Sequence, residues 1–308
     1  MHRVVFVTAV VSALLLWFTA RGEIYRWTDA DGRVQFGDRP PVEFRERVQN
    51  LSTSYESHIP FSFKIIPVGY AMPAATHTKV EVAVSKIHNI YRSRLGLEFR
   101  TDPNFDIRIF ADEDSFLRYG DGPALKGLAS GYYSPQLNEA VTWQQRGFEQ
   151  MLEVITHEAN HALMHHAFGR VPPWLNEGLS EYFERMEVFG LAVVIHPNPD
   201  WDQLTKAELR SGNITPLAEY LGMNQRDWQV HNLSGNRSYA QAWSLVYFLM
   251  STHDGTQLLG QLLDTLSQMD PEVFSGAAVI EANYGGGLAA LETAWRAWAL
   301  GPKAAHHY

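Results

Sequence analysis

Two histidines four residues apart, with a glutamate directly after the first, are the feature that most constrains this chain. His157, Glu158 and His161 form a His-Glu-x-x-His pattern within residues 156–162. On an α-helix, residues four apart lie about 40° apart around the axis and about 6 Å apart along it. Both imidazoles can therefore face one metal ion, and imidazole nitrogen suits Zn²⁺. Glu158 would lie at the edge of the same face, where it can act on a water bound to the metal.

The sequence around this pattern predicts two helices. Across residues 148–168 apolar side chains recur at helical spacing over a wide face. After the Pro172-Pro173 pair, residues 174–183 indicate a second, short helix that carries Glu177 and Glu181. The second helix therefore supplies carboxylates to a histidine pair that would otherwise have no partner.

The two carboxylates can take different roles at such a site. A catalytic zinc usually has three protein ligands and an open fourth position, so Glu177 would complete a His₂Glu set with His157 and His161. Glu181 follows one turn later on the same helical face, where it can accept the free N–H of a ligand imidazole. Spacing alone leaves the exchange of these two roles open.

The run His-Glu-Ala-Asn-His, followed by Trp-Leu-Asn-Glu-Gly-Leu-Ser-Glu-Tyr-Phe, resembles the gluzincin metallopeptidases and, among them, the peptidase-MA-like group. The resemblance implies that His157, His161 and Glu177 are zinc ligands. It also implies that Glu158 is the general base and that Glu181 supports a ligand imidazole. All five positions carry the residue type that the motif requires.

Two later stretches, which begin at Tyr239 and at residues 285–287, resemble segments of the same group and extend the similarity over most of residues 61–302. The resemblance implies a zincin-like metallopeptidase domain over residues 61–302. No Gly-x-Met-Glu-Asn motif, with which gluzincin aminopeptidases hold a substrate amino terminus, precedes the first helix. An endopeptidase is therefore favoured over an exopeptidase.

We expect an α+β fold for this domain. A small mixed sheet and the metal-binding helix would form an upper lobe, and a mainly helical lower lobe would follow. Residues 138–143 are our candidate for an exposed edge strand that a substrate peptide could extend. An ordinary edge strand covered by a loop remains an equal alternative. Strands are expected at residues 61–68, 106–110, 131–133 and 140–143, and further helices at 78–95, 216–221, 239–251, 256–266, 271–283 and 288–300.

The N-terminal residues are expected to direct export. Residues 1–22 have a short basic start and an apolar run too short to span a bilayer comfortably, which is typical of a signal peptide. Cleavage after Gly22 or Ala20 is expected, and an uncleaved anchor is the alternative. The mature protein would lie in the periplasm or be secreted, with no integral membrane segment left.

Two short segments are expected before the main domain. Residues 23–50 alternate around an Asp-Gly turn and predict a β-hairpin module, which resembles a module of unknown function on many exported bacterial proteins. Such a small hairpin is only marginally stable alone, so it would dock on the main domain or on an envelope partner. A surface appendage without a binding role is an equal alternative. Residues 51–60 read as a linker.

Composition excludes some classes of partner. The net charge is −9 over 308 residues, and loss of Arg3 and Arg21 with the signal peptide changes it to −11. A nucleic-acid partner is therefore disfavoured. The chain has no cysteine, so its stability depends on the apolar core and on metal rather than on disulfides.

The pattern as a whole predicts an exported zinc-dependent endopeptidase that acts on protein or peptide substrates. Tyr239, at the start of a predicted helix, is our candidate donor to the oxyanion, with His231 as the second choice and simple packing of Tyr239 as the alternative. A non-catalytic zinc-binding envelope protein is the competing hypothesis. The presence of Glu158 favours the enzyme, since a binding protein has no evident use for the base.

The remaining histidines are not expected to bind the metal. His88 would be a core or surface residue, His165 and His166 would lie at a helix end, and His306 and His307 would form a tail.

Overall fold

The computed structural model describes residues 25–28, 34–37, 49–50, 61–99, 103–120, 130–233 and 235–308. The chain divides into two compact units, Met1–His58 and Ile59–Tyr308. The expected signal peptide, residues 1–22, and the expected linker, residues 51–60, lie outside the described residues.

The first unit contains a small antiparallel sheet. Strand β1 (Tyr25–Thr28) pairs with β2 (Val34–Gly37), which confirms the predicted hairpin. A third strand that was not predicted, β3 (Gln49–Asn50), pairs with the other side of β1.

The second unit begins with a four-stranded mixed sheet. Its strands are β4 (Ser62–Val68), β5 (Asn104–Phe110), β6 (Gly131–Ser134) and β7 (Glu139–Trp143), in the order β4-β5-β7-β6. β5 runs parallel to β4 and to β7, whereas β6 and β7 form an antiparallel hairpin. All four strands were predicted.

The predicted edge strand was wrong. Residues 138–143 contain β7, which has β5 on one side and β6 on the other. Alternating side chains reveal a strand but not which strands become its neighbours, so the sequence did not show that β7 would pair with β5. Among the described strands, β6 forms the edge of the sheet beside β7 instead.

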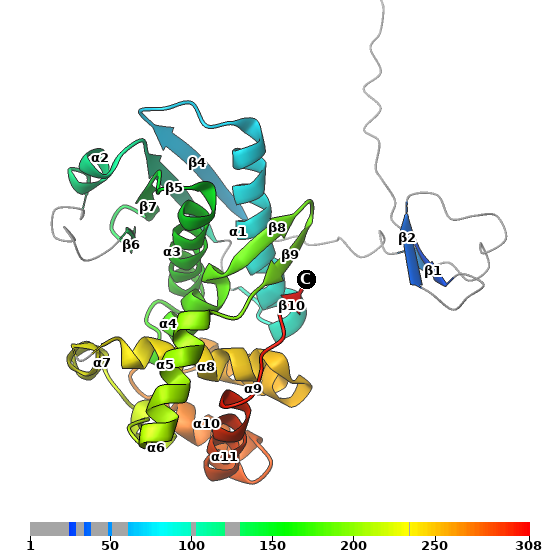
Figure 1. Ribbon diagram of the computed structural model, residues 1–308, viewed down its shortest axis with the longest axis vertical. Helices are drawn as coiled ribbons and strands as arrows, with labels where there is room; N and C mark the ends of the chain where they lie inside the picture. The colour runs from blue at the N-terminus through cyan, green and yellow to red at the C-terminus, as the bar shows by residue number, and fades with distance from the viewer. Residues whose placement is uncertain are drawn as a thin grey trace, which may run out of the picture. The chain divides into compact units, whose positions relative to one another are not determined.

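Helices cover both faces of this sheet (Figure 1). The long helices α1 (Ala74–Leu95) and α3 (Phe148–Phe168) share one hydrophobic core with the side chains of Ile107 and its neighbours on β5. The short helix α2 (Glu113–Leu117) packs through a smaller cluster on the other face, which includes Val141. The sheet thus fixes α3, the helix that carries the two histidines.

The rest of the unit is mainly helical, so the predicted mixed α+β class is confirmed. A second small sheet has the order β10-β9-β8. Its edge strand β10 consists of His306 and His307, which were expected to form a tail. The elements are α4 (Pro173–Glu184), β8 (Met186–Phe189), β9 (Ala192–Ile195), α5 (Pro199–Ser211), α6 (Leu217–Tyr220), α7 (Gln225–Asn232), α8 (Arg237–Ser251), α9 (His253–Gln268), α10 (Gly276–Asn283), α11 (Gly287–Ala299) and β10 (His306–His307).

Sequence reasoning missed some of these elements for a physical reason. In α5, for example, most residues are polar and only Thr205 and Glu208 are buried. Its start is instead fixed by Asn198, whose side chain accepts hydrogen bonds from the backbone N–H groups of Asp200 and Trp201.

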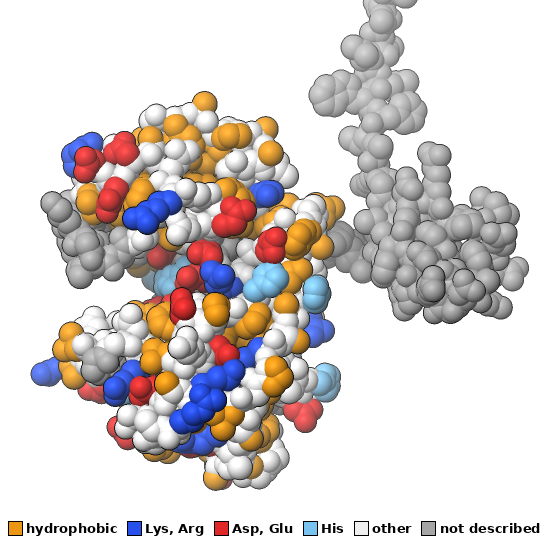
Figure 2. Space-filling model, viewed as in Figure 1, with side chains coloured by type: hydrophobic (Ala, Val, Ile, Leu, Met, Phe, Trp, Pro, Cys, Tyr) orange, Lys and Arg blue, Asp and Glu red, His pale blue; other side chains and the backbone are white. Residues whose placement is uncertain are grey.

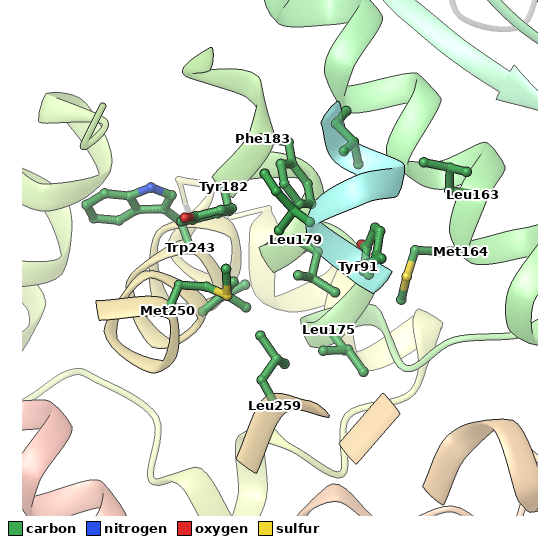
Figure 3. Packing of buried hydrophobic residues seen from close by; sticks show 14 of the residues in the cluster. Tyr91, Leu163, Met164, Leu175, Leu179, Tyr182, Phe183, Trp243, Met250 and Leu259 are labelled. Carbon is green, nitrogen blue, oxygen red and sulfur yellow. The ribbon is translucent and has the colours of Figure 1, made fainter. Parts of the chain in front are cut away.

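The core of the unit lies where α4 packs against α8 (Figure 3). Gly178 permits this close approach, because a Cβ atom there would lie 2.7 Å from Val246 Cγ2 and 2.9 Å from the carbonyl oxygen of Ala242. Leu175, Leu179 and their neighbours on α4 fill the space around the contact. The packing fixes α4, and with it the carboxylates that face α3.

Candidate metal centre

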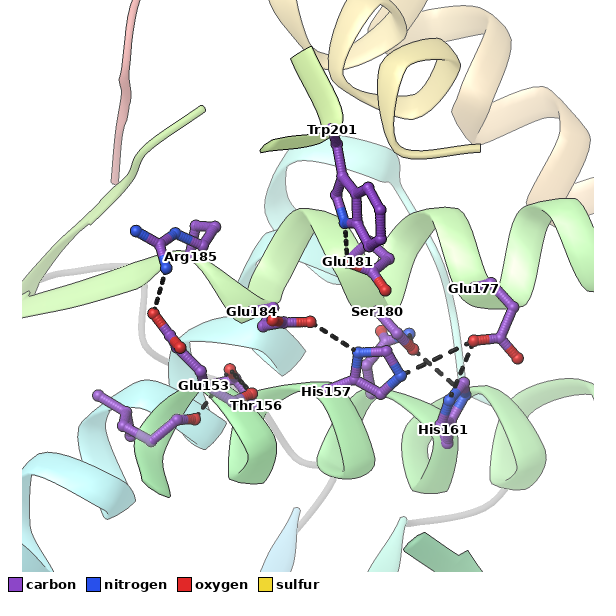
Figure 4. Close-up of polar contacts among 12 residues, drawn as sticks. Glu153, Thr156, His157, His161, Glu177, Ser180, Glu181, Glu184, Arg185 and Trp201 are labelled. Atoms are coloured by element: carbon purple, nitrogen blue, oxygen red, sulfur yellow. Dashed lines mark hydrogen bonds and ion pairs between the residues drawn. The ribbon is translucent and has the colours of Figure 1, made fainter. Parts of the chain in front are cut away.

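Two imidazoles and one carboxylate converge between α3 and α4 (Figure 4). The Nε2 atoms of His157 and His161 each lie 3.7 Å from the same oxygen, Oε2 of Glu177. These three ligand atoms all lie within 4.8 Å of one another. The structure therefore brings together the three residues that the sequence predicted as metal ligands.

The spacing of these atoms fits a tetrahedral metal ion. Zinc bonds of ~2.0–2.1 Å in tetrahedral geometry separate the ligand atoms by roughly 3.4 Å. The observed nitrogen–oxygen separation of 3.7 Å is slightly wider. Small side-chain rotations would close the difference, so the group can hold a metal ion.

His157 is held from behind by a carboxylate. Its Nδ1 atom lies 3.2 Å from Oε2 of Glu184, the last residue of α4. With Nδ1 protonated, the ring donates to Glu184 and leaves the Nε2 lone pair free for a metal. Glu184 was not predicted, although it lies seven residues after Glu177 and therefore on the same face of α4.

The structure differs from the prediction for Glu181. Its carboxylate accepts a 2.5 Å hydrogen bond from the indole N–H of Trp201 on α5, and Glu184 takes the expected place beside the imidazole. Glu181 still lies close by, since it forms a second possible metal-binding group with His157 and Glu184. The helix α5, which the sequence did not predict, gives Glu181 its partner.

His161 is held from behind by a neutral, buried chain of hydrogen bonds. Its Nδ1 atom lies 3.2 Å from Ser180 Oγ, which also accepts a 2.9 Å bond from Asn160 Nδ2. Asn160 Oδ1 in turn accepts a 2.5 Å bond from the hydroxyl of Tyr91 on α1. Ser180, Asn160 and Tyr91 are fully buried. The orientation of this ring is therefore fixed from the core.

Carboxylates dominate the electrostatics of the centre. Burial lowers the pKa of His157, but hydrogen bonds to Glu177 and Glu184 outweigh it, so the pKa lies well above its ordinary value. Burial raises the pKa of Glu177, but the two imidazoles outweigh it and the net pKa is lowered. Burial and the charge of Glu184 raise the pKa of Glu181 to about 8. The negative charge of the carboxylates around the two imidazoles would also favour a bound cation.

Glu158 lies on the sheet side of the centre. It is only 9% exposed, and burial raises its pKa. The edge strand β6 passes directly above it, because a Cβ atom at Gly131 would lie 3.3 Å from Glu158 Cγ and 2.4 Å from Val154 Cγ1. Glycine therefore lets β6 approach α3 at the position of the predicted general base.

The centre opens onto a cavity of about 270 Å³. In Figure 2, acidic and histidine side chains gather where the surface is hollowed between the upper and lower parts of the second unit. The cavity lies between β6, α3 and the start of α4. Its lining residues are Tyr133, Pro135, His161, His165, Gly169, Val171, Asn176 and Glu177.

The two candidate oxyanion donors differ in their surroundings. Burial raises the pKa of Tyr239, and the negative charge of Glu177 adds to this. His231 is engaged elsewhere, with Nε2 3.1 Å from Thr215 Oγ1 and Nδ1 2.7 Å from Ser238 Oγ. The surroundings therefore favour Tyr239 over His231.

Histidines that were not expected to bind metal lie outside this group. His88 is buried and stacks on Phe61 with ring centroids 4.5 Å apart. His166 Nε2 contacts Asn138 Oδ1 at 2.9 Å. His306 contacts the hydroxyl of Tyr182 on α4 at 2.7 Å, so the C-terminal strand helps to hold the helix that carries Glu177.

No helix in the described part of the chain combines the length and the apolar character that crossing a bilayer requires.

Two family models match the chain. Residues 12–57 match "Domain of unknown function (DUF4124)", and residues 151–271 match "Protein of unknown function (DUF1570)". The first match includes the hairpin of the first unit, and the second includes most of α3, all of α4, and Tyr239. A search of curated proteins finds no match.

Proposed function

We propose that this protein is an exported zinc-dependent endopeptidase of the gluzincin type. One observation carries the proposal. The Nε2 atoms of His157 and His161 converge on one oxygen of Glu177, while both Nδ1 atoms are engaged by groups behind the rings. This donor set, two imidazoles and one carboxylate, is that of a catalytic zinc site with an open position.

His157, His161 and Glu177 would hold the zinc. When bound, zinc would polarise the scissile carbonyl and lower the pKa of a water molecule. Glu158 follows the first ligand on α3 and lies beneath the edge of the sheet. Its carboxylate would take the proton of the attacking water and pass it to the leaving amine.

The edge strand β6 would position the substrate. One side of β6 pairs with β7, and no strand among the described residues pairs with its other side. An extended peptide can add to such an edge through backbone hydrogen bonds, which are independent of sequence. Because Tyr133 of β6 and the ligands His161 and Glu177 line the same cavity, a peptide paired with β6 would pass the metal centre.

Tyr239 would stabilise the negative charge that develops on the carbonyl oxygen. Removing one such donor typically lowers turnover ~10²–10³-fold. Tyr239→Phe should show this loss in kcat with unchanged zinc content. Turnover near that of the wild type would contradict the role, and loss of both activity and zinc would indicate a structural role instead.

The function is tested by incubating the purified mature protein with unfolded protein substrates, with and without a chelator. We expect cleavage that the chelator abolishes and that added zinc restores. Glu158→Gln is the matched control, since it should lose cleavage ~10²–10⁴-fold while it keeps its metal. Bound metal without chelator-sensitive cleavage would favour the competing function, a zinc-binding envelope protein without catalysis.

The metal assignment has its own test. Elemental analysis of the wild type should find about one zinc per chain. His161→Ala and Glu177→Ala should lower the zinc content far more than Glu158→Gln does. An empty site in Glu181→Ala together with a full site in Glu177→Ala would reverse the roles of these two glutamates.

Export is part of the proposal and rests on residues 1–22. Amino-terminal sequencing of protein from the periplasm or the medium should begin at Glu23 or at Arg21. Recovery of the intact chain in the membrane fraction would support the uncleaved anchor instead.

A further inference from the structure

A second, larger cavity adjoins the candidate metal centre. Its volume is about 760 Å³, against about 270 Å³ for the cavity that His161 and Glu177 line. Val171, in the loop between α3 and α4, lines both cavities. The two cavities are therefore neighbours, so a polypeptide bound at the metal centre would lie close to the second cavity.

Three loops contribute apolar side chains to the walls of this second cavity, beside the polar residues Asn224 and Gln225. The α3–α4 loop contributes Val171 and Pro172, and the α6–α7 loop contributes Leu221 and Met223. Phe274, just before α10, closes the third side. Walls of this kind favour an aromatic or large aliphatic side chain, because its burial removes apolar surface from water.

Charged residues of this cavity lie at its rim. Arg170 Nη1 and Glu272 Oε1 form a 2.9 Å ion pair, and their side chains are 74% and 73% exposed. Arg226 is also exposed. Exposed charges at the rim contribute little energy to an interaction. The cavity would therefore select substrate side chains by size and apolar character rather than by charge.

We propose that this second cavity is a specificity subsite, which binds a large apolar side chain of the polypeptide substrate at a position away from the scissile bond. The inference rests on the proposed endopeptidase function and narrows its substrates to extended or unfolded chains with such a residue near the cleavage site. Because Val171 lines both cavities, the second cavity is a neighbour of the one at the metal centre, and we assign the substrate as its occupant on this ground.

A glycine in the lining allows the cavity to be narrowed. A Cβ atom at Gly222 would meet only the carbonyl oxygen of Glu219, at 3.6 Å, which is an ordinary contact. Gly222→Trp should therefore fold and reduce the space. Gly285→Trp is the matched control, because a Cβ atom there meets nothing within 4 Å and Gly285 does not line the cavity. Met223→Ser, which removes part of an apolar wall, is the second test variant.

The test uses quenched fluorescent peptides that are identical except for one position, which carries Phe, Leu, Ala or Glu on either side of a fixed scissile bond. At one position, the wild type and Gly285→Trp should prefer Phe or Leu over Ala by about 10-fold to 100-fold in kcat/KM. In Gly222→Trp and Met223→Ser this preference should fall to about 3-fold or less.

A second readout does not need cleavage. The same peptides, bound to the Glu158→Gln variant, should show the same preference in Kd by fluorescence anisotropy, and Gly222→Trp should remove it. A preference that is absent, or unchanged in Gly222→Trp, would overturn the subsite but not the endopeptidase. Absence of any chelator-sensitive cleavage would overturn the proposed function, and the Kd ratio would then decide on the cavity alone.

Discussion

The two imidazoles of the metal centre are held in different ways. Behind His157 stands Glu184, a charged group at the end of α4 whose side chain is 27% exposed. Behind His161 stands a neutral chain, Ser180 and then Asn160, that continues into the core. Both arrangements leave Nε2 facing Glu177. The difference suggests that changes on the His157 side act through charge, whereas changes on the His161 side act through the stability of the fold.

Breaking the neutral chain should have the largest effect. Asn160→Leu leaves the buried hydroxyl of Tyr91 without its partner, which costs ~1–3 kcal/mol, and removes one of the two partners of Ser180. The free energy of unfolding of the metal-free protein should fall by about 3 kcal/mol in urea titrations. Asn213→Leu, at an exposed position, should change it by less than about 0.5 kcal/mol. If Asn160→Leu lowered the unfolding free energy by less than about 1 kcal/mol, the supports of His157 and His161 would not differ in their effect on stability.

On the charged side, the effect should appear in metal binding. Glu184→Ala should weaken zinc binding about 10-fold to 100-fold, because the carboxylate orients His157 and raises its basicity. The unfolding free energy of the metal-free protein should change by less than about 1 kcal/mol. Kd is measured by competition with a chelator. Glu187→Ala is the control, since Glu187 pairs at 2.9 Å with an exposed histidine, His196, outside the centre. Equal Kd values for the two variants would contradict the role of Glu184.

The position of the third ligand, Glu177, depends on the packing of α4 against α8 rather than on a hydrogen-bond partner. Gly178→Ala places a methyl group against Val246 and the Ala242 carbonyl, and forced overpacking of this kind costs ~1–3 kcal/mol. We expect a loss of about 2 kcal/mol in unfolding free energy, measured by urea titration. Gly285→Ala, where a Cβ atom has open space, should lose far less. If both variants were equally stable, α4 and α8 would have to be further apart than they are here.

Features that depend on residues close together in sequence could be predicted, whereas features that depend on contacts between distant parts of the chain could not. Apolar spacing predicted α3 with both of its ends, and the His-Glu-x-x-His spacing predicted which side chains would converge with Glu177. Local patterns also gave the four strands of the main sheet, but not their order, and so the edge strand was assigned wrongly.

The supports behind the two rings depend on contacts that no local pattern contains. Tyr91 and Asn160 are 69 residues apart in sequence, and Trp201 reaches Glu181 from α5, a helix that was not predicted. Glu184 could have been considered, because Glu177, Glu181 and Glu184 share one face of α4. Spacing alone could not decide which carboxylate meets His157, since that depends on how α4 crosses α3.

His88 offers a comparison with His157 that separates burial from carboxylate contacts. His88 is buried and His157 is partly buried, but His88 lies between the aromatic rings of Phe61 and Phe99 instead of beside glutamates. Burial, with a smaller contribution from the charge of Arg92, lowers the pKa of His88 to about 4. Burial acts on His157 in the same direction, but there the carboxylates reverse it.

This difference predicts how stability depends on pH. Because the pKa of His88 is about 4 in the folded protein and about 6.5 in the unfolded chain, the unfolded chain binds more protons between these values. The contribution of His88 is therefore fully present above pH 6.5 and is lost as the pH falls toward 4. Between pH 7 and pH 5 it should lower the unfolding free energy by roughly 1.5–2 kcal/mol.

The variant His88→Phe keeps an aromatic ring between Phe61 and Phe99 and removes the titration. The drop in unfolding free energy from pH 7 to pH 5, measured by urea titration of metal-free protein, should be smaller in this variant by that amount. His306, whose pKa burial also lowers to about 4, is present in both proteins, so the difference isolates His88. An equal drop in the two proteins would mean that the ring of His88 accepts a proton in the folded state. Burial without a carboxylate would then not account for the contrast with His157.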